Sequence, residues 1–213
     1  MYATGDKVAQ GFADAVTWWH HAAERGHAAA QYNLGVAYST GTGVAQDSAQ
    51  AVEWYRKAAE QGHAGAQTNL GLSYTNGAGV AQDYREAVRW YRKAAEQGFA
   101  GAQFNLGLMH YNGAGVAQDY AQAIRWFSKA ADQGLADAQL NVGIIYASGK
   151  GVAQDYVEAH KWLNIAAARV SGEDQNHYSE VRDEIATMMT RAQLLEAQKR
   201  ARAWADAFER RQQ

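Results

Sequence analysis

The sequence of 213 residues predicts an all-α protein built from stacked helix–turn–helix repeats. The pentapeptide GVAQD occurs four times, and its valine recurs every 36 residues. A fixed period of this length is typical of supersecondary units that stack on one another. Tryptophan and glycine keep the same step, which indicates that whole repeats are alike. The periodic residues are Val44, Val80, Val116 and Val152; Trp18, Trp54, Trp90, Trp126 and Trp162; Gly62, Gly98 and Gly134.

The first half of each repeat predicts an amphipathic helix that ends at glycine. In the repeat of residues 28–63, Ala30, Leu34 and Tyr38 are spaced by four and share one helical face. Gly35 recurs in every repeat, although glycine inside a helix costs about 1 kcal/mol relative to alanine. We therefore expect a close backbone approach at this position. Positive φ angles at two further glycines then turn the chain, in this repeat at Gly41 and Gly43.

The second half predicts another amphipathic helix, with an acidic residue at its start. Trp54 and Tyr55 lie on its apolar face, among alanines at core spacing. Asp47 is followed three residues later by Gln50, and this spacing resembles a capping box. Each such cap contributes about 1 kcal/mol. The aspartates at this position are Asp47, Asp83, Asp119 and Asp155.

The patterns A-x-x-x-L-G-x-x-Y, G-x-G-V-x-x-D and A-x-x-W-x-x-x-A-A-x-x-G resemble the Sel-1-like repeat, a relative of the tetratricopeptide repeat. The resemblance covers roughly residues 2–172. It implies a right-handed α/α superhelical solenoid of helix–turn–helix repeats with a period of 36, whose first helices line a concave face. It also implies an adaptor or scaffold that assembles protein complexes, most often in bacteria.

This resemblance divides the chain into repeats and a cap. We expect a partial first repeat, its second helix only, at 1–27, and a C-terminal helical cap at 173–213 that contains a capping box at Thr190 and Gln193. The four full repeats are 28–63, 64–99, 100–135 and 136–172.

The N-terminal end departs from the repeat. Tyr2 aligns with Tyr38, while Lys7 and Gly11 replace the second loop glycine and the aspartate cap. Two interpretations stay open, a degenerate cap and a fragment of a longer chain. The fragment is favoured because the helix around Trp18 would otherwise expose apolar surface.

The composition argues against several classes of function. The 20 basic and 22 acidic residues are nearly balanced, so no excess of positive charge indicates binding to nucleic acid or to an anionic membrane. The absence of cysteine excludes disulfides and thiolate metal sites. We expect no cofactor, no metal site and no membrane span, and a cytoplasmic protein, although an exported longer form stays open. No S-x-x-K, H-E-x-x-H or G-x-S-x-G string supports catalysis.

The candidate binding residues come from the resemblance. In tetratricopeptide units, first-helix positions two before, one before, two after and five after the packing leucine face a ligand. An asparagine ladder at the second of these positions could grip the backbone of a peptide; alternatively, each asparagine orders its own repeat. The periodic tryptophans are interpreted as inter-helix packing. The predicted partner-binding residues are Tyr32, Asn33, Asn69, Phe104, Asn105, Leu108, Tyr111 and Asn141.

These observations predict a non-enzymatic scaffold that binds a partner peptide or helix in its concave groove. One alternative is a structural protein that self-associates by stacking through the open N-terminal end. Another is a β-lactam hydrolase, because a cysteine-rich branch of the resembled family has been linked to β-lactam binding. This chain lacks those cysteines.

Overall fold

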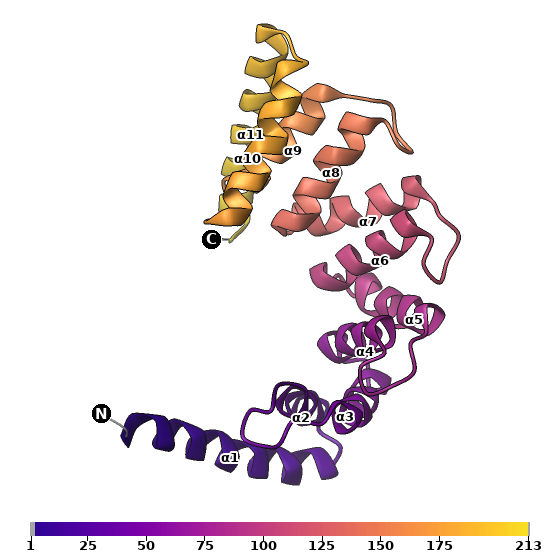
Figure 1. The fold of residues 1–213 in the computed structure, drawn as a ribbon, viewed down its shortest axis with the longest axis vertical. Coiled ribbons are helices and arrows are strands. Elements are labelled where there is room, and N and C mark those ends of the chain that lie inside the picture. The colour runs from indigo at the N-terminus through magenta and orange to yellow at the C-terminus, as the bar shows by residue number, and fades with distance from the viewer. Residues whose placement is uncertain (1–2, 213) are drawn as a thin grey trace. The chain divides into compact units, whose positions relative to one another are not determined.

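The computed structural model describes residues 3–212 of the chain, with side chains from Gly11 onward. These residues form eleven helices and no strand, which confirms the predicted all-α class (Figure 1). The helices are α1 (Ala3–Glu24), α2 (Ala28–Thr40), α3 (Ser48–Glu60), α4 (Ala64–Asn76), α5 (Tyr84–Glu96), α6 (Ala100–Asn112), α7 (Tyr120–Asp132), α8 (Ala136–Ser148), α9 (Tyr156–Ala167), α10 (Glu173–Thr187) and α11 (Arg191–Gln212).

The helices pack mainly against their neighbours in the chain, and they form two compact units. One unit extends to Ala102 and includes Ala114–Val116; the other comprises Gln103–Gly113 and continues from Ala117. In the first unit α1 packs on α2, α2 on α3, α3 on α4 and α4 on α5. In the second, α7 packs on α8 and α8 on α9, and both α10 and α11 pack on α9.

The repeated pentapeptide owes its sequence to the geometry of the turn between paired helices. Gln46 Nε2 donates to the carbonyl of Ser39 at 2.8 Å, and the N–H of Asp47 donates to the carbonyl of Tyr38 at 2.9 Å. The Asp47 carboxylate accepts from the N–H groups of Ala49 and Gln50 at 2.9 and 3.0 Å, as predicted for a cap. The reciprocal half of the box differs from the prediction, because the Asp47 N–H is already bonded to Tyr38.

The helical glycines allow a close approach of the paired helix, and the nearest atoms of that helix belong to a side chain. A Cβ atom built on Gly71 would lie 2.7 Å from the ring of Tyr91 in the paired helix. On Gly107 it would lie 2.6 Å from the ring of Phe127. Glycine therefore lets the two helices of a pair close over an apolar side chain.

Three of the five periodic tryptophans are buried in the helix pairs. Trp54 is 8% exposed and lies edge-on to His20 of α1, with ring centroids 5.7 Å apart. Trp90 and Trp162 are also buried, and Trp126 is half-buried. Trp18 is 74% exposed, so the packing prediction was wrong for it. Its counterpart Trp54 packs against α1, the helix that precedes its own pair, and within residues 3–212 no helix lies before α1.

The N-terminal helix is longer than the second helix of the other pairs. α1 runs without a break through Gly11, the position that aligns with the aspartate cap of the other repeats. Lys7 and Gly11 provide neither a loop glycine nor a carboxylate cap, so the helix continues. Tyr2 lies outside the described residues.

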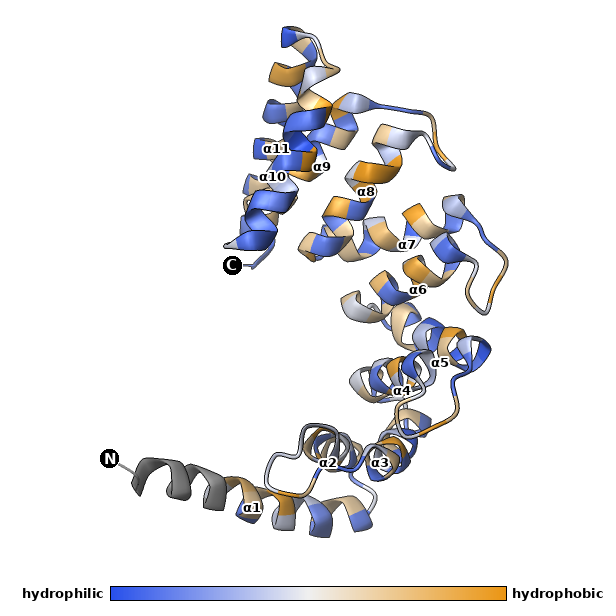
Figure 2. Cartoon of the chain, in the orientation of Figure 1, coloured by the Kyte–Doolittle hydropathy of each residue, from blue (hydrophilic) through white to orange (hydrophobic). Residues whose placement is uncertain are grey.

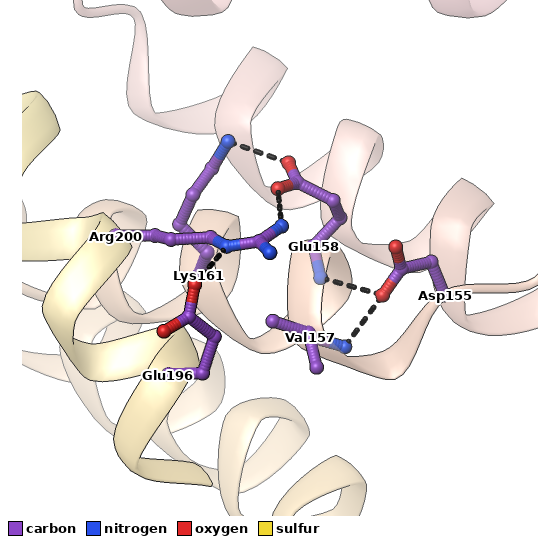
Figure 3. A network of polar contacts seen from close by, with 6 residues as sticks. All are labelled: Asp155, Val157, Glu158, Lys161, Glu196 and Arg200. Atoms are coloured by element: carbon purple, nitrogen blue, oxygen red, sulfur yellow. Dashed lines mark hydrogen bonds and ion pairs between the residues drawn. The ribbon is translucent and has the colours of Figure 1, made fainter. Parts of the chain in front are cut away.

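The C-terminal helices α10 and α11 close the second unit. The predicted capping box is complete: the Thr190 N–H donates to Gln193 Oε1 at 2.9 Å, and the Gln193 N–H donates to Thr190 Oγ1 at 3.3 Å. Figure 3 shows how α11 is tied to α9. Glu158 accepts from Lys161 at 2.5 Å and from Arg200 at 2.9 Å, and Arg200 also pairs with Glu196 at 2.8 Å.

Candidate partner-binding surface

The first helices of the repeats, α2, α4, α6 and α8, carry the predicted binding residues. We call their outward side the first-helix face and describe it separately in each unit. Each of these helices buries an apolar residue completely, Leu34, Leu70, Leu106 and Val142 respectively. The residues two before, one before, two after and five after that buried position define the face.

Two of the four residues that follow the buried position by two are exposed and apolar. Leu72 on α4 is 45% exposed, and Ile144 on α8 is 36% exposed. Val36 and the predicted Leu108 are half-buried at the same position. Each unit therefore presents a large aliphatic side chain to solvent from a first helix.

The two predicted aromatic residues that precede the buried leucine are held by packing. Tyr32 stacks on His63 with ring centroids 4.5 Å apart. Phe104 lies 5.6 Å from Phe127 and packs against the core of the second unit. Both rings are half-buried, so each has only part of its surface available to a partner.

The four asparagines lie half-buried on the first-helix face but do not form a uniform ladder. Asn141 Nδ2 donates to the carbonyl of Asp137 at 2.8 Å within α8. Asn69 is hydrogen-bonded to the Tyr55 hydroxyl; burial raises the pKa of Tyr55, and the bonds to Asn69 and Ser39 oppose that rise. Two of the amides thus serve different internal contacts, Asn69 to the preceding repeat and Asn141 within its own helix. Asn33 and Asn105 complete the row.

Tyr111 is engaged by its own unit. Its ring lies 5.1 Å from that of Tyr120 in an edge-on arrangement. The ammonium group of Lys150 lies 5.7 Å from the Tyr111 ring and 5.6 Å from the Tyr120 ring, a cation–π arrangement. Tyr111 therefore joins α6, α7 and the loop after α8.

A buried row of glutamines, which the sequence analysis missed, links successive helices. Gln67 Nε2 donates to the carbonyl of Ala59 at 3.0 Å, and Gln97 Nε2 donates to Gln67 Oε1 at 2.7 Å. The same two bonds recur through Gln31 and Gln61. The signal was present, because glutamine recurs every 36 residues at both positions. It indicates an internal role, since these side chains are buried or bonded inside the fold.

A metal centre and a membrane span would each be recognisable in the structure. Among the side chains described from Gly11 to Gln212, no cluster of three or more histidine, aspartate or glutamate residues could hold a metal ion. Within the same part of the chain, no helix is both long and apolar enough to span a bilayer. The surface is therefore defined by its exposed apolar and amide side chains.

Comparison with known proteins identifies the repeat. Five segments match the Sel1 repeat model: residues 1–27, 28–63, 64–99, 100–135 and 136–170. A comparison with curated proteins found no match.

Solved structures share the fold. A Sel1 repeat protein from Oxalobacter formigenes is 34% identical, with a TM-score of 0.70 over 78% of this chain and 75% of that one. A protective antigen of uropathogenic Escherichia coli strains with an SLR fold is 33% identical, with a TM-score of 0.57. That match covers 92% of this chain but only 50% of the antigen. Cysteine rich protein B of Helicobacter pylori is 25% identical, with a TM-score of 0.50 over 62% of this chain and 94% of that one.

Proposed function

Because the chain belongs to the Sel1 repeat family, we propose that it binds a partner peptide or helix along the first-helix face. Sel1 repeat proteins are generally protein-interaction scaffolds, and the family is typically non-enzymatic. The partner lies across the first helices of one unit and is tethered there in a complex. This is the groove that the repeat pattern predicts.

The exposure of Leu72 and Ile144 carries the proposal. Each lies two residues after a fully buried position, on a helix whose other large apolar side chains are buried or half-buried. Large aliphatic side chains left in solvent at equivalent positions of two repeats are typical of an interaction surface. Both lie beside half-buried members of the predicted set.

The remaining predicted residues supply the flanks of the surface. Tyr32 and Phe104 present part of an aromatic ring, and Leu108 presents part of an aliphatic side chain. Asn33 and Asn105 offer amides that both donate and accept, which suits the backbone of an extended peptide. Asn69, Asn141 and Tyr111 act mainly by holding this surface in place.

The proposal is tested by introducing a charge on the first-helix face, and a matched charge elsewhere on the protein serves as the control. Leu72→Glu should remove partners captured from the source cell, as measured by affinity purification and quantitative mass spectrometry. Leu195→Glu is the control, because Leu195 is 59% exposed on α11, away from the first helices. Both variants should keep the helicity of the wild type. Partners that persist on Leu72→Glu would overturn the assignment of this face.

A second candidate, self-association through α1, is favoured by the exposure of Trp18. Its counterpart Trp54 is buried against α1, the helix that precedes its own pair, so the same position on α1 offers an apolar surface for another helix. A second copy of the chain could stack there. Sedimentation velocity should then show dimers that Trp18→Gln abolishes, and a monomer at every concentration of the wild type would remove this candidate.

A further inference from the structure

The last helix pair differs from the others at two facing positions. In the first unit, Tyr91 of α5 reaches Thr75 of α4, with 3.1 Å between the two hydroxyl oxygens. The equivalent residues of the last pair are Leu163 and Ala147, which are both short and apolar. A gap therefore remains in the last pair where an aromatic ring, that of Tyr55, Tyr91 or Phe127, lies in the earlier ones.

This gap is an apolar hollow in the second unit, between α8, α9 and α10. Leu163 and Ile185 are buried in its floor, while Ile144 and Glu184 reach solvent at its rim. Ala147 and Val181 also line the hollow. Its volume is about 240 Å³. Sites for whole small molecules begin at about 300 Å³, whereas a cavity of about 150 Å³ holds benzene. The hollow therefore suits one large apolar side chain.

The rim of the hollow is acidic on the side of α10. That helix carries five carboxylates and a single arginine, Arg182, which pairs with Asp183 at 2.7 Å. Figure 2 shows the contrast between hydrophilic α10 and the apolar stretch of α8. Glu184 lines the hollow itself, so a partner that fills it places its next residues near a carboxylate. Charge complementarity favours lysine or arginine there.

We propose that this hollow anchors a partner protein segment that inserts one large apolar side chain and pairs a neighbouring lysine or arginine with Glu184. The inference rests on the proposed function, because Ile144 and Ala147 belong to the first-helix face of α8. It adds the chemistry of the partner: a basic segment with an apolar anchor.

The probe is a library of random 12-residue peptides displayed on phage and selected on the purified full chain. Wild-type protein should enrich peptides with leucine, phenylalanine, methionine or isoleucine beside lysine or arginine. Selection on Glu184→Lys should retain the apolar residue and replace its basic neighbour by aspartate or glutamate. An enriched wild-type peptide should bind Glu184→Lys about two- to fivefold more weakly, as expected for an exposed ion pair. Enrichment without this reversal of charge would overturn the role of Glu184.

Filling the hollow tests the anchor. Ala147→Tyr introduces the residue that Tyr111 provides at the same position of the preceding pair, so the fold accommodates it. The enriched peptide should bind this variant about ten- to a hundredfold more weakly by fluorescence anisotropy, the range expected for one buried apolar side chain. Leu195→Glu is the control and should bind as the wild type does. Thermal melts followed by circular dichroism check that each variant is folded.

The outcomes separate this inference from the proposed function. If Leu72→Glu abolishes peptide binding while a folded Ala147→Tyr binds normally, the hollow is refuted and the first-helix face stands. If wild-type protein enriches no peptide, both are refuted. If the wild type sediments as a dimer that Ala147→Tyr converts to a monomer, the occupant is a second copy, and the proposed partner segment is refuted.

Discussion

The hydroxyl of Tyr178 in α10 donates a hydrogen bond to the carboxylate of Asp137 in the first turn of α8. The tyrosine side chain is buried, and its pKa is raised by that burial and then by Asp137. The bond spans 41 residues of sequence and fixes the cap helix on the last helix pair. It thereby holds one wall of the hollow in place.

Removing this hydroxyl should destabilise the second unit. Tyr178→Phe leaves the Asp137 carboxylate without its donor, and the loss of a bond to a charged group costs about 1.5–3 kcal/mol. Urea denaturation measures the loss. Asp137→Asn keeps an acceptor oxygen and should lose less than Tyr178→Phe. Equal stability of Tyr178→Phe and wild type would show that the bond is not formed in solution.

Acidification should loosen the packing of α10 on α9 through His160. This side chain is 3% exposed, at a position that Val52 occupies in an earlier repeat. Burial lowers the pKa of His160, Arg182 lowers it further, and Asp183 opposes both. The folded pKa thus lies below the unfolded value of about 6.5, so the stability from neutral His160 is complete above pH 6.5 and is lost as the pH falls below it.

The comparison with His160→Val isolates this effect from the other histidines. Denaturation at pH 7.5 and 5.5 should show a larger loss for the wild type than for His160→Val, by at most about 1.4 kcal/mol per pH unit below 6.5. Parallel losses in the two proteins would mean that His160 does not titrate with unfolding.

The glutamine row should be needed for stability. Gln97→Met removes the donor to Gln67 Oε1 and leaves a buried acceptor, which costs about 1–3 kcal/mol. Gln46→Met is a matched change, because Gln46 bonds a carbonyl at an exposed turn and should cost less. A melting temperature of Gln97→Met equal to that of Gln46→Met would contradict the internal role of the row.

The protein should be more stable with glycine than with alanine at position 71, although alanine is the better helix former. Gly71→Ala places a methyl group 2.7 Å from the Tyr91 ring, and overpacking of this kind costs about 1–3 kcal/mol. Gly101→Ala is the control in α6, where the nearest atom of Phe99 would be 3.7 Å away. That variant should gain up to about 1 kcal/mol from helix propensity. Relative to wild type, the denaturation midpoint should fall for Gly71→Ala and rise for Gly101→Ala.

The parts of the fold that follow from local chemistry were predictable from the sequence. Asp47 caps a helix because its carboxylate meets N–H groups two and three residues later, and that relationship needs no tertiary information. Periodicity likewise placed the helix pairs. It also indicated that the helix around Trp18 would expose apolar surface without a preceding repeat, and Trp18 is exposed.

The candidate surface was less predictable, since its members differ in what surrounds them. Asn69 and Asn141 share a repeat position but bond to Tyr55 and to Asp137 respectively. The sequence carries Leu163 where the earlier repeats have an aromatic residue, yet the hollow exists only because α10 forms its far wall. The C-terminal cap is not part of the repeat, so its placement depends on tertiary packing and cannot be predicted from the periodicity.

The glutamine bridges have a consequence for how such a chain could grow. Each internal module carries both sides of the bond that crosses a junction: Gln67 donates to the carbonyl of Ala59 in the preceding module, and Ala95 is the equivalent of Ala59 within residues 64–99. A tandem duplication of these residues would therefore present matching partners at both junctions and require no compensating change in the adjoining modules. Length can vary by whole 36-residue increments, while exposed side chains such as Leu72 diversify independently of the framework that carries them.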